Sequence, residues 1–318
     1  MLKKILLNSA KFILALAILI WLVQSGKLDW TLLSKIFDHP VNLFVVVVVQ
    51  LFVLGLITYR LRYLLSPRTS VRLPFKKLYL ITWIGMFFSS VLPGSVTGDI
   101  IKVWYLKRED KSFSTPFLLF ISFLDRLMGL TGLVLLMGLF SILNYQKLSA
   151  LSEKLVPLLH FNFILVSVVF TALVIYFFFP QLINALLGLL PKHSLKTRLE
   201  ALWSDLSGAR KQIFTAIMTS FAVQFLSVLI FHILVSPHYT TNLDLTTLLS
   251  FIPLGFMLVA IPISPGGLGV GHVAFQTLFG FAGESNGANL FNLYFVVMMC
   301  INLFGSVPWL MLKKKVKN

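Results

Sequence analysis

The chain interrupts one apolar stretch at Leu92-Pro93-Gly94-Ser95-Val96-Thr97-Gly98-Asp99 and another at Pro262-Ile263-Ser264-Pro265-Gly266-Gly267-Leu268-Gly269-Val270-Gly271. A helix that crosses the hydrocarbon core of a bilayer cannot be interrupted cheaply, because no water is present there to satisfy the freed N–H and C=O groups. Paired interruptions in corresponding parts of two halves of a chain therefore indicate a binding site near the middle of the membrane.

The composition is that of a membrane protein. Hydrophobic residues make up 58% of the 318 residues and charged residues only 12%, whereas a soluble domain carries roughly 25% charged residues. The net charge of +16 comes from basic residues in short segments beside apolar ones. That pattern is typical of contact with anionic lipid rather than with nucleic acid. The single cysteine, Cys300, excludes a disulfide framework and a multi-cysteine metal site within one chain.

Two topologies fit the apolar segments. These lie near 5–23, 41–59, 78–92, 116–143, 161–179, 213–235, 247–263 and 291–312. If all eight cross the membrane, 15 Lys and Arg residues lie on the cytoplasmic side and 11 outside. If 78–106 and 247–281 are instead re-entrant hairpins, 22 lie inside, four lie outside and Arg126 lies in the membrane. Because cytoplasmic loops carry an excess of Lys and Arg, the second topology is favoured.

The predicted fold is therefore an all-α polytopic membrane protein with about six spanning helices and two oppositely oriented re-entrant helical hairpins. A single integral membrane domain covers 1–318. Its first repeat covers about 41–143 and its second, inverted in the bilayer, covers about 213–312. The segment 5–23 is expected to be an uncleaved first helix, and both termini are expected in the cytoplasm.

The linker at about 161–212 contains a helix and then an amphipathic segment, 192–212. Leucines in that segment fall on one helical face, at Leu195, Leu199, Leu202 and Leu206. Basic residues flank this face, so we expect the segment to lie on the cytoplasmic leaflet.

The two breaks carry candidate lipid-binding residues. Asp99 and Lys102 share a helix face if a helix begins near Gly98, and its N-terminus would attract a phosphate or phosphodiester. In the second break, glycines at Gly266, Gly267, Gly269 and Gly271 would let the backbone approach a ligand closely. The alternative is that these glycines only permit a tight turn or close helix packing.

Asp125 and Arg126 lie inside the apolar run 117–143, close to mid-depth. Charges at that depth are costly and mark a functional site by default. Adjacent helical residues point about 100° apart. We therefore expect Arg126 to face Asp99 or a lipid phosphate and Asp125 to pair elsewhere. A purely structural buried ion pair is the alternative.

Other polar residues are weaker candidates. His272 could titrate near neutral pH, and Glu284 is expected to be solvated in an external loop. The basic residues after the second apolar segment are expected to serve topology and lipid contact; they are Arg60, Arg62, Arg68 and Arg72. No Walker loop, metal cluster, hydrolase elbow or dinucleotide fingerprint appears in the sequence, so we expect no cofactor and no metal.

Three motifs together resemble the lysylphosphatidylglycerol synthase transmembrane-region family, which is also described as flippase-like. They are Pro-Gly-x-x-x-Gly-Asp-x-x-Lys at 93–102, Asp-Arg-Leu at 125–127 and Ser-Pro-Gly-Gly-Leu-Gly-Val at 264–270. The resemblance covers about 10–312. By this resemblance, a role in lipid binding is expected for Pro93, Gly94, Gly98, Asp99, Lys102, Arg126, Pro265, Gly266, Gly267 and Gly269.

In bifunctional members of that family the membrane region moves aminoacylated phospholipid between leaflets, and a soluble domain performs aminoacyl transfer. This chain has no room for that domain, so the resemblance implies the translocating half alone. Family members often carry an acidic residue shortly after the second glycine motif, where this chain has His272. The departure weakens the case for proton or cation coupling at that position.

These observations predict a non-enzymatic flippase-like transporter in the cytoplasmic (inner) membrane. Its substrate would be a phospholipid or a polyprenyl-phosphate-linked lipid with an anionic or zwitterionic head group. Two alternatives are a membrane-embedded lipid-modifying transferase and an accessory scaffold subunit of an envelope complex. A transferase needs substrate-side carboxylates and often a metal, and a scaffold would tolerate substitution of Asp99, Lys102 and Arg126.

Overall fold

The computed structural model describes Ser34 and residues 37–66, 73–92, 96–189, 194–261, 267 and 269–314. Within these ranges the chain is helical with short connections, and no strand occurs. The fold is an all-helical, multi-pass membrane protein, as the sequence predicts. Five segments in the described ranges are long and apolar enough to cross a bilayer: Pro40–Leu65, Thr115–Leu143, Leu155–Phe178, Arg210–His238 and Gly287–Met311.

These segments match five of the six predicted spanning helices. They contain the helices α3 (Pro40–Leu65), α6 (Thr115–Leu143), α8 (Leu155–Phe178), α11 (Arg210–Val235) and α14 (Gly287–Leu303). The predicted first helix, 5–23, lies outside the described residues.

Short helices flank both Pro-Gly breaks. α4 (Phe75–Val91) and α5 (Thr97–Glu109) lie on either side of the first, and α12 (Leu245–Ala260) and α13 (Val270–Phe281) lie on either side of the second. Within each pair the two helices pack against one another. At 1.5 Å per residue, none of the four reaches the roughly 30 Å of a hydrocarbon core. The order long, short, short, long thus occurs twice along the chain.

The remaining helices are brief. They are α7 (Tyr145–Leu151), α9 (Pro180–Leu189), α10 (Ser194–Ser207), the 3₁₀ turn η2 (Ser236–His238) and α15 (Ser306–Lys314). Within the predicted amphipathic segment 192–212, residues 194–207 form α10 and the last residues belong to α11, while 192 and 193 lie outside the described residues. The Tyr176 hydroxyl donates to the Leu206 carbonyl at 2.6 Å and so ties α8 to α10. The position of α10 on a leaflet stays a prediction.

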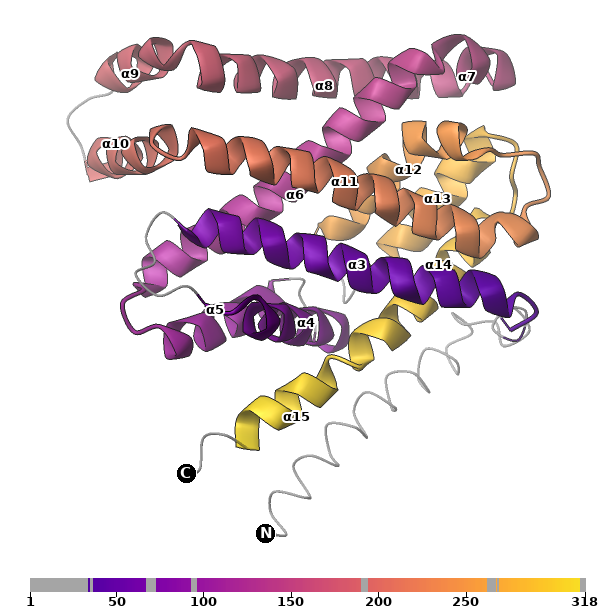
Figure 1. The fold of residues 1–318 in the computed structure, drawn as a ribbon. Coiled ribbons are helices and arrows are strands. Elements are labelled where there is room, and N and C mark those ends of the chain that lie inside the picture. The colour runs from indigo at the N-terminus through magenta and orange to yellow at the C-terminus, as the bar shows by residue number, and fades with distance from the viewer. Residues whose placement is uncertain are drawn as a thin grey trace.

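α11 is the central helix of the packing. It lies beside α3 and against α6, which in turn packs against α12 and α8 (Figure 1). Two large apolar cores result. One is built mainly from α11 to α14, and the other from α3 to α6 with the start of α11. The core built from α3 to α6 includes the helices that flank the first break, and the core built from α11 to α14 includes those that flank the second.

α8 is mostly exposed, but a buried polar group attaches it to the bundle. The Asn162 amide donates to Ser141 Oγ at 3.0 Å and to the Ser250 carbonyl at 3.1 Å. These bonds join α8 to α6 and α12. Between helices in a membrane such bonds supply part of the association energy, since apolar side chains meet an equally apolar solvent.

Glu284 is buried, which corrects the expectation that it is solvated. The turn between α13 and α14 directs its carboxylate toward the loop that follows η2. There it accepts hydrogen bonds from the backbone and hydroxyl of Thr240 at 2.7 and 2.8 Å, and from the backbone of Thr241 at 3.1 Å. It also accepts from the Asn286 backbone at 3.2 Å. A local sequence reading misses this burial because the Thr240 and Thr241 donors lie more than 40 residues away.

These hydrogen bonds to Glu284 predict that the stability of the protein depends on pH. Burial raises the pKa of Glu284, but the bonds from Thr240, Thr241 and Asn286 outweigh it, so the pKa lies below the ordinary 4.5. A lowered folded-state pKa stabilises the protein above the unfolded-state value and ceases to do so as pH falls through the folded-state value. We expect Glu284→Gln to lower the free energy of unfolding by about 2 kcal/mol at pH 7, because bonds to a charged acceptor are lost.

Thermal unfolding of the detergent-solubilised protein, followed from pH 7 to pH 3, tests this. The difference between wild type and Glu284→Gln should shrink below pH 4.5. Glu153→Gln, which removes a carboxylate at an exposed position, is the control and should unfold like the wild type throughout. A Glu284→Gln difference that stays constant over this pH range would contradict the interpretation.

Candidate functional site

A cavity of about 460 Å³ lies between the two broken segments. One side is formed by α3, α4, α5 and α6, and the other by α12, Gly267 and α14. Its volume falls within the roughly 300–1,000 Å³ of small-molecule sites. Elements more than 100 residues apart thus line one space, and its use as a binding site stays a prediction.

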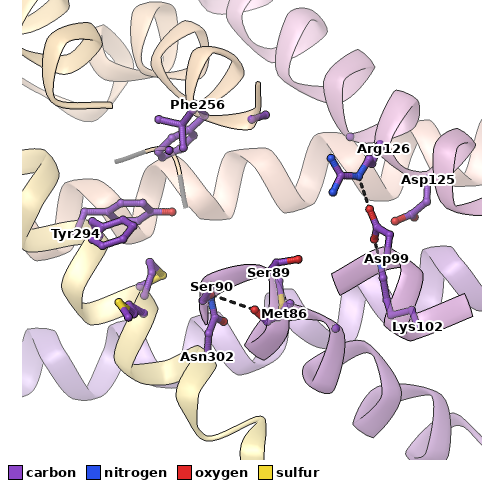
Figure 2. Close-up of a pocket in the computed structure, with 18 of the residues that line it drawn as sticks. Met86, Ser89, Ser90, Asp99, Lys102, Asp125, Arg126, Phe256, Tyr294 and Asn302 are labelled. Carbon is purple, nitrogen blue, oxygen red and sulfur yellow. Dashed lines mark hydrogen bonds and ion pairs between the residues drawn. The ribbon is translucent and has the colours of Figure 1, made fainter. Parts of the chain in front are cut away.

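Asp99 is the centre of the charged side of this cavity. Its Oδ1 accepts from Lys102 Nζ at 2.6 Å, and its Oδ2 accepts from Arg126 Nε (Figure 2). α5 begins at Thr97, close to the predicted Gly98, so Asp99 lies in its first turn and Lys102 one turn further along the same face. Arg126 reaches this group from α6, on the side expected from the sequence.

Asp125 pairs elsewhere, also as expected, but its partner corrects another expectation. Arg60 Nε donates to Asp125 Oδ1 at 2.7 Å, and Arg60 Nη1 donates to Ser220 Oγ at 2.8 Å. Arg60 is buried, whereas Arg62 is exposed and its role in topology and lipid contact stays a prediction. Arg60 therefore joins α3, α6 and α11 in the interior and does not reach the lipid-facing surface. Arg68 and Arg72 lie outside the described residues.

The glycines in and beside the two breaks have different structural roles. A methyl group at Gly98 would lie 2.1 Å from the Gly85 carbonyl oxygen, so Gly98 permits α5 to touch α4. Gly271 packs against Phe291 in the same way. Gly267 and Gly269 have φ of +77° and +84°, which favour glycine. Of these, Gly267 also lines the cavity. The predicted contacts of Pro93, Gly94, Pro265 and Gly266 lie outside the described residues.

His272 caps the start of α13. Its Nδ1 accepts from the Gly269 backbone at 3.2 Å, and its Nε2 lies 2.6 Å from Asn292 Oδ1. An accepting Nδ1 places the ring proton on Nε2, which can then donate to Asn292. The histidine thus completes the N-terminus of α13 and ties it to α14.

The other side of the cavity is apolar, and sequence reasoning missed it. Phe256 and Tyr294 lie across from Arg126 and Asp99 (Figure 2). α14 supplies most of this wall through residues that recur at helical spacing: Phe291, Tyr294, Phe295, Met298, Met299 and Asn302. That i, i+3, i+4, i+7 pattern is visible in the sequence, but it also fits ordinary core packing. Asn302 donates to Ser90 Oγ at 3.0 Å and joins α14 to α4.

The chain matches the family model described as lysylphosphatidylglycerol synthase TM region over residues 8–307. The protein belongs to this family. The match covers nearly the whole chain and includes both breaks, so it supports a multi-pass membrane protein with a role connected to membrane lipid. No curated protein and no solved structure matches the chain.

Proposed function

We propose that this protein moves a phospholipid or a polyprenyl-phosphate-linked lipid between the leaflets of the cytoplasmic membrane. The observation that supports this most is the two-sided cavity, with an ionic cluster from α5 and α6 on one side and an aromatic and methionine wall from α12 and α14 on the other. A lipid has the same two-sided chemistry, since its head group carries charge and its chains are apolar. Methionine side chains adapt to irregular apolar ligands.

The charges in the cavity favour an anionic group. Arg60 and Asp125 neutralise one another with side chains only 6% and 7% exposed. In the second cluster, one carboxylate, Asp99, serves two cations, Lys102 and Arg126. Among the described residues that line the cavity, this leaves one positive charge in excess. A phosphodiester carries one negative charge and would balance it.

The short helix pairs suggest how access could alternate. In this proposal α4 with α5 and α12 with α13 are re-entrant hairpins that enter from opposite faces, as parts of two inverted repeats. The head group would occupy the cavity between them while the acyl chains remain in the bilayer. Because both cavity carboxylates engage cations, the arrangement favours ligand binding over the general-base role that a transferase requires.

Removal of the Arg126 charge tests the proposal. In proteoliposomes we expect Arg126→Gln to lower leaflet-to-leaflet transport of a labelled phospholipid by about tenfold or more, because a charge-assisted bond to the head group is lost. Arg62→Gln is the matched control, since it removes a guanidinium from an exposed position on α3.

The assay should use a panel of phosphatidylglycerol, phosphatidylethanolamine, phosphatidic acid and a polyprenyl phosphate. Full transport by Arg126→Gln with every lipid would rule out the proposed head-group site. No transport of any of these lipids by the wild-type protein would contradict the flippase function itself.

A further inference from the structure

The Asp99 carboxylate bridges two cations in the way that a head-group phosphate would. Its Oδ1 accepts from Lys102 and its Oδ2 accepts from Arg126, so each oxygen serves one cation. A phosphodiester also presents two equivalent oxygens that share one negative charge. We propose that Asp99 is a built-in competitor of the lipid phosphate and sets how quickly the lipid leaves. This inference rests on the proposed function.

Competition follows from where the three side chains lie. The side chains of Asp99 and Lys102 are each 12% exposed, whereas Arg126 is 36% exposed and lies at the cavity surface. A phosphate that approaches Arg126 meets the Asp99 carboxylate on the same guanidinium. Two like charges at such close range repel strongly when little water screens them. The phosphate therefore binds fully only as Asp99 gives up its contact with Arg126.

Asp99 can give up that contact at small cost. It lies in the first turn of α5, where a carboxylate is favoured by the N-terminal end of the helix. Lys102, on the same face one turn away, moves with it on the same helix. The carboxylate can thus alternate between Arg126 and its own helix terminus without becoming an isolated buried charge.

Such a competitor would speed the release of the lipid from the site. Two cations in a partly dehydrated cavity would hold a phosphodiester tightly, and a transporter that binds its substrate too tightly turns over slowly. The Asp99 carboxylate beside the site lowers the affinity for the phosphate. It pairs with Lys102 and Arg126 again as the lipid leaves. Asp99 would then determine turnover, while Arg126 determines binding.

The test compares binding with turnover in Asp99→Asn. We expect this variant to bind dihexanoylphosphatidylglycerol about tenfold more tightly than wild type, since a competing anion is removed. Transport at saturating lipid should become slower in the same variant. Asp38→Asn makes the same substitution at an exposed position and should change neither quantity. Glycerol 3-phosphate, run in parallel, distinguishes a lipid site from a site for free phosphate.

The outcomes separate this inference from the function on which it rests. If Asp99→Asn binds no more tightly than wild type while Arg126→Gln loses binding, Asp99 is only a structural counter-ion and the inference fails alone. If Arg126→Gln also binds and transports normally, the proposed head-group site fails with it. If the wild-type protein transports none of the lipids, the proposed function itself fails.

A measurement on the wild type covers the case in which Asp99→Asn does not fold. Infrared difference spectra of protein labelled with ¹³C-aspartate should show a shifted carboxylate band when dihexanoylphosphatidylglycerol is added. Asp99→Glu, which keeps the charge but loses the label at this position, should lack that shift. An unchanged aspartate band at saturating lipid would overturn the inference.

Discussion

Asp125→Asn is expected to lower the free energy of unfolding by about 3–5 kcal/mol, because it leaves the buried Arg60 guanidinium without its counter-charge. The two side chains are 6% and 7% exposed, so solvation replaces little of the lost charge partner. Ser220 is the other hydrogen-bond partner of Arg60, and a hydroxyl does not neutralise a charge. Unfolding of the micelle-solubilised protein by sodium dodecyl sulfate would measure the change.

Two variants make this prediction specific. Lys147→Gln breaks an ion pair with Asp244 whose side chains are about half exposed, and it should cost less than about 1 kcal/mol. The double variant Arg60→Met with Asp125→Leu removes both charges and should be more stable than Asp125→Asn alone. A double variant as unstable as the single one would show that the buried pair is not the source of the loss.

Gly98→Ala is expected to be similarly damaging, with a cost of about 3 kcal/mol from overpacking. The new methyl group would lie 2.1 Å from the Gly85 carbonyl oxygen and equally close to Ser89 Oγ. One of these atoms is backbone, so α4 and α5 must separate to make room. Unfolding midpoint and yield of folded protein are the readouts.

Gly280→Ala is the matched control. Gly280 lies within α13 and has no atom near enough to meet an added methyl group. Alanine in a helix is favoured over glycine by about 1 kcal/mol, so this variant should be at least as stable as wild type. If Gly98→Ala behaves like Gly280→Ala, then α4 and α5 are not in the contact described above.

The sequence predicts the long helices well because each one carries a continuous apolar run that needs no distant partner to be recognised. The sequence also predicts different partners for Asp125 and Arg126, because neighbouring helical residues point in different directions, and the structure confirms this. The Arg126–Asp99 contact follows from the same reasoning, combined with the expected start of a helix near Gly98.

Residues whose partners are remote in the sequence could not be predicted in this way. Arg60 and Arg62 look alike beside the same apolar run, and only the packing of α11 buries one of them. In the sequence Glu284 resembles an exposed loop carboxylate, and only the fold places the Thr240 backbone within hydrogen-bond distance of it. The aromatic wall of α14 has a visible period, but the period does not say whether that face meets a core or a cavity.

The Arg60 bridge also bears on how such a molecule could move. Arg60 fastens α3 to α6 through Asp125 and to α11 through Ser220. These three helices form a rigid frame, because shifting any of them past the others would separate the buried Arg60 from Asp125 or from Ser220. In the proposed transport cycle, the motion that opens the cavity to either leaflet would therefore fall to the short helices, which would move against this frame.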